Sequence, residues 1–130
     1  MGCNSHLTVE IQGQWEHAPT KWSTWALDIP ESRDYALYEA MAGVRGEDGN
    51  ALVAPRGIPA DADTATEYWI KRYGEDGHTH SWLYPKEFHA AVEKVNRDVD
   101  SCWIALDQLL QVLEKIYGEN HARVVFYFDN

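Results

Sequence analysis

The chain has 130 residues, of which 45% are hydrophobic, and this size and composition suit one domain with a single core, so we expect residues 1–130 to form one domain. Its 21 acidic and 11 basic residues give a formal charge of −10, which repels phosphates and argues against direct nucleic-acid binding. No apolar run approaches the roughly 18 residues of a membrane span, and two cysteines make no disulfide framework. We therefore expect a cytoplasmic protein with free thiols that contacts no membrane.

The N-terminal region predicts a β-hairpin. Apolar and polar residues alternate over residues 6–12, which is the period-two pattern of a half-buried strand. Gln12 and Gly13 indicate a turn, and residues 14–17 are expected to form the returning strand. Residues 21–29 hold two tryptophans and fit either a third short strand or a loop anchored by aromatic side chains.

A short helix is predicted next. Ser32 favours the N-cap position, and Gly43 is a suitable residue to end the helix after residue 42. The expected inner face of this helix consists of Tyr35, Tyr38, Met41 and Ala42.

A long irregular loop is expected to follow this helix. Five glycines and prolines interrupt the chain between Gly43 and Asp63, and loops of this length are usually functional or disordered. Asp63 or Thr64 then suits the N-cap of a short helix through residues 69–72.

Residues 84–118 carry the strongest periodic signal. Apolar residues recur at alternating spacings of four and three, without a proline or glycine between Pro85 and Gly118. The stripe consists of Phe88, Val92, Val95, Val99, Cys102, Leu106, Leu109, Leu113 and Ile116. Its flanks are polar in the first half and apolar in the second, which favours one long helix on a sheet over a coiled coil. A break near residues 98–101, with Asp100 capping a second helix, is the alternative.

The C-terminal segment predicts a central strand. Residues 123–128 are apolar on both faces and rich in β-branched and aromatic side chains. We therefore predict an α+β fold, in which a small, mostly antiparallel sheet combines the N-terminal hairpin with the C-terminal strand. A long helix from the C-terminal half and a shorter helix cover this sheet, and Leu106, Leu109 and Leu113 face it.

Five regions spanning nearly the whole chain form a recognisable pattern. They are Met1-Gly2-Cys3-Asn4-Ser5-His6, residues 33–45, Pro55-Arg56-Gly57-Ile58-Pro59, residues 76–83 and residues 124–130. In these regions the chain resembles a family of small bacteriophage and prophage proteins of uncharacterised activity. The family usually has Asp at the position of Asn4, so a role that needs a carboxylate there is not implied. The resemblance implies a phage origin and the cytoplasm of a host cell as the setting, and it supplies no mechanism.

The first candidate site is a zinc centre. Its four ligands would be Cys3, His6, His78 and His80. The spacing His-x-His places two imidazoles near one ion, and a thiolate and a third imidazole complete a tetrahedral set. In the alternative reading, His78 and Ser81 cap the long helix or brace the preceding loop, and Cys3 is simply buried.

The second candidate site is a phosphate pocket. Its ligand-binding residues would be Arg33, Arg45, Arg56, Ser81 and Trp82, because guanidinium forks beside glycine-rich backbone suit an anion. His6 or His78 would be the catalytic base, and Trp22 or Trp82 would be a stacking surface. In the alternative reading, the three arginines pair with carboxylates such as Asp34, Glu47 and Asp48.

The third candidate is an acidic interaction surface. Carboxylates occur in pairs at Asp61 and Asp63, Glu75 and Asp76, and Asp98 and Asp100. The apolar stripe of Phe88, Val92 and Val95 would dock on the partner beside these charges. The competing interpretation is a solvated surface without a partner.

These patterns favour binding over catalysis. The chain has no Ser-His-Asp, Walker or Cys-x-x-Cys signature, so no specific motif supports an enzyme. We predict a phage accessory protein that counters a host defence process by binding a host protein, such as a defence or nucleic-acid-handling enzyme, through its acidic surface. The alternative is a binder or hydrolase of a phosphate-bearing small molecule such as a nucleotide signal, with or without a metal. The long apolar stripe also allows a homodimer.

Overall fold

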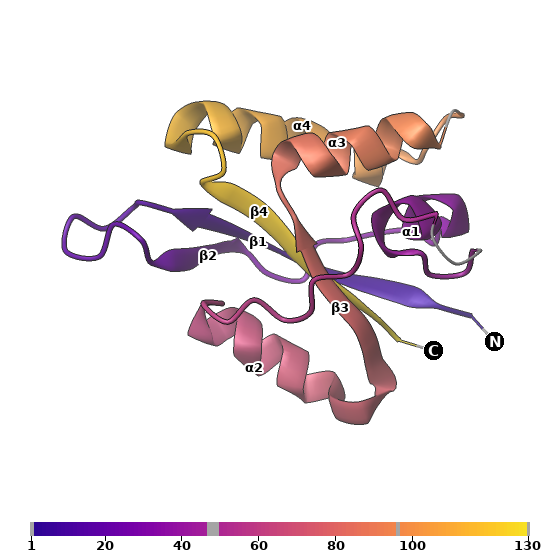
Figure 1. Ribbon diagram of the computed structural model, residues 1–130, viewed down its shortest axis with the longest axis horizontal. Coiled ribbons are helices and arrows are strands. Elements are labelled where there is room, and N and C mark those ends of the chain that lie inside the picture. Colours follow the sequence, from indigo (N-terminus) through magenta and orange to yellow (C-terminus); the bar gives the residue numbers. More distant parts are fainter. Residues whose placement is uncertain (1, 47–49, 96, 130) are drawn as a thin grey trace.

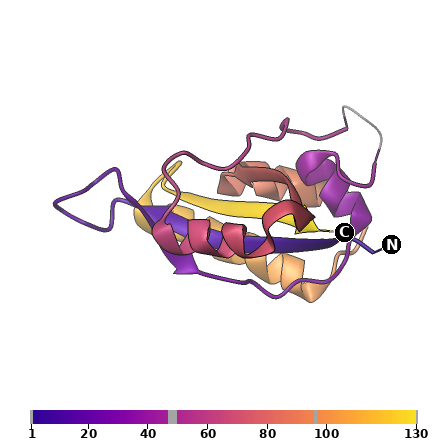
Figure 2. The ribbon, with the colours of Figure 1, turned by 90° about the horizontal axis from the view of Figure 1, so that it is seen from below.

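The computed structural model describes residues 2–46, 50–95 and 97–129, and in it a four-stranded antiparallel sheet with the order β2-β1-β4-β3 forms the centre of the molecule. The elements are β1 (Asn4–Gln12), β2 (Trp22–Ala26), α1 (Tyr35–Ala42), α2 (Thr64–Tyr73), the 3-10 helix η1 (Gly74–Asp76), β3 (Gly77–Leu83), α3 (Pro85–Lys94), α4 (Ser101–Tyr117) and β4 (Ala122–Asp129). Helices α1, α3 and α4 cover one face of the sheet and α2 covers the other (Figures 1 and 2). The predicted α+β fold is confirmed.

The C-terminal strand is the central element of the sheet, as predicted. β4 lies between β1 and β3 and is buried along its length except at Asp129. Its side chains alternate between the two faces, so Phe126 enters the larger core under α1, α3 and α4, while Tyr127 packs against α2. The register pairs Asn4 with Asp129, so the N- and C-terminal ends of the chain lie close together (Figure 1).

Helix α4 packs on the sheet through the side chains that its periodicity predicts. Leu106 and Leu113 are each only 3% exposed, and Leu109 packs against the same core at its margin. Each fully buried leucine or aromatic side chain contributes about 1.5–3 kcal/mol relative to exposure to water.

The prediction of one continuous helix over residues 84–117 is wrong, and the alternative with a break is the one that the structure shows. α3 ends at Lys94, and Asp100 occupies the N-cap of α4 in an extended conformation. The intervening sequence is rich in Val, Asn and Asp, which are poor helix formers. A continuous helix would also extend about 50 Å, whereas a nine-residue strand such as β1 spans about 30 Å. Two shorter helices lying side by side can therefore bury their apolar residues against the sheet, whereas one long helix would extend beyond the end of the sheet.

The hairpin was predicted correctly, but its second strand was placed too early. Residues 14–17 are an exposed excursion closed by a single bridge between Trp15 and Ala18, and Trp15 is 52% exposed. The returning strand is β2, with Trp22 opposite Gln12. β3 was not predicted as a strand, because most of its residues are polar. It is an edge strand, and its pairing with β4 is irregular around Thr79 (φ 53°).

The ends of α1 and α2 test the capping predictions. Asp34, not Ser32, caps α1, since its Oδ1 accepts a hydrogen bond from Leu37 N–H (3.0 Å). Gly43 ends α1 in the left-handed region, as predicted, with φ 74°. Asp63 caps α2, as predicted. Tyr35 is 38% exposed, so it does not belong to the inner face of α1.

Candidate functional site

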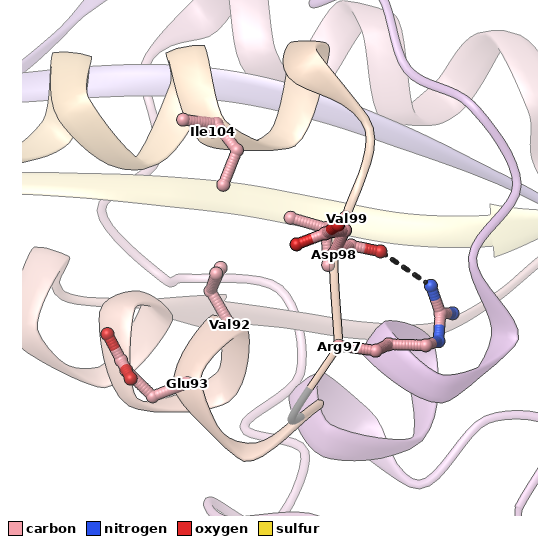
Figure 3. Close-up of a pocket in the computed structure, with 6 residues that line it drawn as sticks. All are labelled: Val92, Glu93, Arg97, Asp98, Val99 and Ile104. Carbon is pink, nitrogen blue, oxygen red and sulfur yellow. Dashed lines mark hydrogen bonds between the residues drawn. The ribbon is translucent and has the colours of Figure 1, made fainter.

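A groove opens where α3 turns into α4, at the break that the continuous-helix prediction missed. The two helices run in opposite directions. This is shown by the hydrogen bond from Gln111 Nε2, in the second half of α4, to Pro85 O at the start of α3 (3.1 Å). At the near end they diverge around a cavity of about 700 Å³, shown in Figure 3. It is lined by Val92, Glu93, Arg97, Asp98, Val99 and Ile104, which we call the α3/α4 groove.

The groove combines an apolar floor with carboxylates. Val92 and Ile104 point toward each other from the two helices (Figure 3). Glu93 is exposed on α3, and Asp98 is exposed in the connection. The basic residue of the lining, Arg97, extends toward α1, and its Nη1 donates to the backbone oxygen of Asp98 at 2.9 Å (Figure 3). Its Nη2 donates to the buried Asp34 carboxylate at 2.7 Å. The groove thus presents two exposed carboxylates beside apolar surface, and Glu93 also lies 3.4 Å from His89 Nε2.

His89 lies one helical turn before Glu93, and two carboxylates raise its pKa. Its Nδ1 is 2.9 Å from Oδ2 of Asp107 on α4, and its Nε2 is 3.4 Å from Glu93 Oε1. The hydrogen bond to Asp107 is the main reason that the pKa of His89 is raised, and burial opposes it only in part. His89 therefore carries more positive charge near neutral pH than an isolated imidazole does.

The structure does not gather the three arginines of the predicted phosphate pocket. Arg33 Nε donates to Asn4 Oδ1 (2.8 Å), and Arg45 lies over the Tyr35 ring with 5.4 Å to its centroid. Arg56 lies elsewhere, in a bidentate pair with Glu87 at 2.8 and 2.6 Å. Glu47 and Asp48, named as alternative partners of the arginines, lie outside the described residues.

Arg56, Ser81 and Trp82 do come together, as the ligand-binding prediction requires. Arg56 N–H donates to Ser81 Oγ (3.0 Å), and the Arg56 guanidinium stacks 4.3 Å from the centroid of a Trp82 ring. Glu87 also accepts from Tyr84 N–H (2.9 Å) at the start of α3. Burial alone would raise the pKa of Glu87, but the hydrogen bonds from Arg56 and Tyr84 hold it below its usual value.

These residues border a second cavity of about 450 Å³ on the α2 face of the sheet. We call it the tryptophan–arginine cleft and define it by Trp22, Arg56, Asp61, Trp82, Tyr84 and Arg123. Its aromatic rings and guanidinium groups alternate. The Arg123 guanidinium lies 3.9 Å from the centroid of a Trp22 ring and 5.5 Å from that of a Trp82 ring.

Sequence reasoning missed the centre of this cleft, a buried ion pair between Glu10 and Arg123. Glu10 is fully buried and Arg123 is 2% exposed. Arg123 Nε donates to Glu10 Oε1 at 2.8 Å, while Glu10 Oε2 accepts from Asp63 N–H (2.8 Å) and Thr66 Oγ1 (2.7 Å). An acidic residue in β1 and a basic residue at the start of β4 were the available signal, and the register, which pairs Glu10 with Arg123, turns it into a contact.

The four predicted zinc ligands do not form one site. Cys3 is buried in the core under α1, whereas His6 and His80 stack on Tyr127 on the opposite face, at 5.0 and 5.2 Å between ring centroids. His78 packs toward Phe128, on the same face as Cys3. Across residues 2–46, 50–95 and 97–129, no three His, Cys, Asp or Glu side chains are grouped to hold a metal ion.

The two catalytic candidates also lie apart. His6 Nε2 is 2.6 Å from Asp129 Oδ2, and the His6 ring packs against both Tyr73 and Tyr127, which also contact each other. His78 Nδ1 is 2.9 Å from Thr79 Oγ1. His6 is thus oriented by a carboxylate, but the surrounding side chains are aromatic, and no candidate nucleophile contacts it within the described residues.

The predicted acidic surface is divided among different roles. Asp61 pairs with Arg123 (3.0 Å), Asp63 caps α2, and Asp100 accepts from Ser32 Oγ (2.5 Å). Glu75 and Asp76 are exposed in η1, and Asp98 lines the groove. The stripe of Phe88, Val92 and Val95 is not a free docking surface as predicted, because Phe88 is fully buried and the two valines pack against the core.

A search of protein-family models, curated proteins and solved structures finds no match to this chain. In the part of the chain that the structure describes, no helix combines the length and the apolar character needed to cross a membrane.

Proposed function

We propose that this protein binds a partner protein, and that the α3/α4 groove receives a basic, amphipathic segment of that partner. The observation that supports the proposal is the combination of an apolar floor with the exposed carboxylates of Glu93 and Asp98. Arg97, which would otherwise neutralise them, is held by Asp34.

The groove suits the two parts of a lysine or arginine side chain. The aliphatic stem packs on Val92, Val99 or Ile104, and the charged head reaches a carboxylate at the rim. One exposed ion pair contributes only about 0–1 kcal/mol, so affinity requires several such contacts together with apolar burial. The net charge of −10 assists by steering a basic partner toward the protein.

The chemistry of the groove favours a partner that itself handles nucleic acid. A surface that binds phosphates is basic, and an acidic protein that occupies it blocks its normal ligand. Since the chain resembles small bacteriophage proteins, the partner we propose is a host protein, and the role is to counter or modulate a host process such as defence.

The test is capture from host-cell lysate with two double variants. Glu93→Lys with Asp98→Lys reverses the charge of the groove, and Glu75→Lys with Asp76→Lys makes the same change of net charge on η1. The wild type and the η1 variant are expected to retain the same nucleic-acid-handling protein, and the groove variant to lose it. Equal loss from both variants would show that only net charge matters, and equal retention would show that the groove is not the binding surface.

A further inference from the structure

A row of apolar side chains remains exposed or half-buried along α4, on the side away from α3. The row, which we call the α4 seam, consists of Cys102, Ala105, Leu109, Val112 and Ile116. Spacings of three, four, three and four residues keep these side chains on one side of the helix over a length of about 21 Å. Asp107 and Gln111 contact α3 from the other side of α4. The α4 seam is therefore separate from the α3/α4 groove.

The N-terminal half of the α4 seam is hollow, and its C-terminal half projects. A cavity of about 230 Å³ lies between α4 and the segment that connects β2 to α1, and it is lined by the apolar residues Ile29, Pro30, Cys102, Ala105, Leu106 and Leu109. Trp103 Nε1 donates to Ser32 O (3.0 Å) and holds this segment against α4. Farther along the helix, Val112 is 51% exposed and Ile116 is 66% exposed. The seam thus has a hollow at one end and a ridge at the other.

The two ends of the α4 seam also carry opposite charges. Ser32 Oγ donates to Asp100 Oδ2 (2.5 Å) and lies 3.6 Å from Cys102 Sγ, so the exposed carboxylate of Asp100 lies at the hollow end. Lys115 is exposed between Val112 and Ile116 at the ridge end. Shape and charge are therefore complementary between the two halves of one and the same surface.

We propose that the α4 seam binds a second copy of this chain, with the two α4 helices antiparallel about a two-fold axis near Leu109. In this arrangement the ridge of each copy fills the hollow of the other, and the Lys115 end of one copy lies beside the Asp100 end of the other. Each apolar contact is made twice, because the interface is isologous. A parallel arrangement would place hollow against hollow and like charges together.

The charge of the whole chain supplies a signature for this contact. Two copies that each carry a charge of −10 repel one another, and salt screens that repulsion. An apolar dimer of this protein should therefore become tighter between 50 and 300 mM NaCl, because the exposed pairs of Lys115 and Asp100 contribute only about 0–1 kcal/mol each. A basic partner bound at the α3/α4 groove should respond to salt in the opposite direction.

Sedimentation equilibrium of the full chain under reducing conditions tests the dimer. The mass of the wild type is expected to rise from 14.9 kDa toward twice that value over the micromolar range. Ile116→Lys places a charge in the hollow of the other copy and is expected to weaken the dimer about tenfold or more. Ile58→Lys makes the same change at a residue that is 49% exposed on the α2 face, and it should leave the dimer unchanged.

Three results of this experiment would overturn the proposal. They are a wild type that stays at 14.9 kDa up to millimolar concentration, an equal effect of the two substitutions, and a dimer that salt weakens. Ile116 is 66% exposed, so we expect its substitution to leave the fold intact, and the urea unfolding midpoint checks this.

Oxidative cross-linking tests the orientation of the two helices. Leu109→Cys is expected to give a disulfide-linked dimer, because the two-fold axis brings the two copies of position 109 together. In the wild type, Cys102 would lie about 21 Å from Cys102 of the second copy, which is too far for a disulfide, and Cys3 is buried. The wild type should therefore stay unlinked. Efficient linking of the wild type, or none of Leu109→Cys, would overturn the antiparallel arrangement.

Discussion

The α3/α4 groove and the tryptophan–arginine cleft differ in how far their charged side chains are paired with one another. In the groove, Glu93 and Asp98 are exposed, Arg97 turns to Asp34, and the partly exposed His89 lies 3.4 Å from Glu93. In the cleft, Arg56 and Arg123 are both held by carboxylates. The first region can gain attraction from a charged partner, while the charged groups of the second are already paired with one another. Four predictions sharpen this difference, beginning with the largest effect.

The buried ion pair of the cleft should dominate stability. Glu10→Gln removes the buried carboxylate partner of Arg123 and leaves only the exposed Asp61, and breaking a buried pair costs about 3–5 kcal/mol. Urea unfolding is expected to show this loss in the free energy of unfolding. Glu16→Gln, in the exposed excursion between β1 and β2, is the matched control and should change it by less than about 0.5 kcal/mol. A loss below about 1 kcal/mol for Glu10→Gln would mean that the pair is not the centre of the network.

The second prediction tests the charge of the α3/α4 groove with salt. Binding of a basic partner to the groove is expected to weaken about tenfold or more between 50 and 300 mM NaCl, because the Debye length shortens and exposed charges are screened. Fluorescence anisotropy of a labelled basic amphipathic peptide gives the measurement. A salt-independent peptide affinity would contradict the role given to Glu93 and Asp98.

The third prediction concerns Glu87, which joins the cleft to the start of α3. Glu87→Gln weakens the Arg56 pair and the bond from Tyr84 N–H, and we expect a loss of about 1–2 kcal/mol in the free energy of unfolding. Because the pKa of Glu87 is lowered by folding, its contribution is present above the unfolded pKa and is lost as the pH falls through the folded pKa. The variant and the wild type should therefore converge in stability at acidic pH. If the difference in the free energy of unfolding between the two proteins stayed the same at acidic pH, the ionised carboxylate of Glu87 would not be the source of the stabilisation.

The sequence was sufficient for the parts of the fold that depend on local pattern. Alternation identified β1, a run that is apolar on both faces identified β4, and the stripe of Leu106 and Leu113 identified the buried face of α4. It could not decide between one helix and two, because the stripe keeps its phase across residues 95–100 and the choice depends on the length of the sheet beneath. The result matters for function, since the groove exists only because the chain turns there.

The candidate sites were harder to predict, because they depend on contacts between distant residues. Arg56, Ser81 and Trp82, three members of the predicted ligand-binding set, lie together, while Arg33 and Arg45 do not join them. Glu10 and Arg123 are 113 residues apart and were not predicted to pair. The zinc set failed for a reason that parity explains in part. Cys3 and His6 differ by an odd number of positions along one extended segment, so their side chains fall on opposite faces of the sheet.

The smallest predicted effect is a pH dependence at the edge of the groove. Folding raises the pKa of His89 through its hydrogen bond to Asp107, so the stabilisation is fully present below the unfolded pKa of about 6.5 and is lost as the pH rises through the folded pKa. The His89 side chain is 48% exposed, and solvent screening keeps the effect below about 1 kcal/mol. His89→Gln should therefore lower the free energy of unfolding at pH 6 and have little effect at pH 8.5, whereas His17→Gln, on the exposed excursion, should have little effect at either. Asp107 faces His89 from α4 and Glu93 from its own helix, so a penalty that grew with pH would mean that neither carboxylate stabilises a protonated imidazole there.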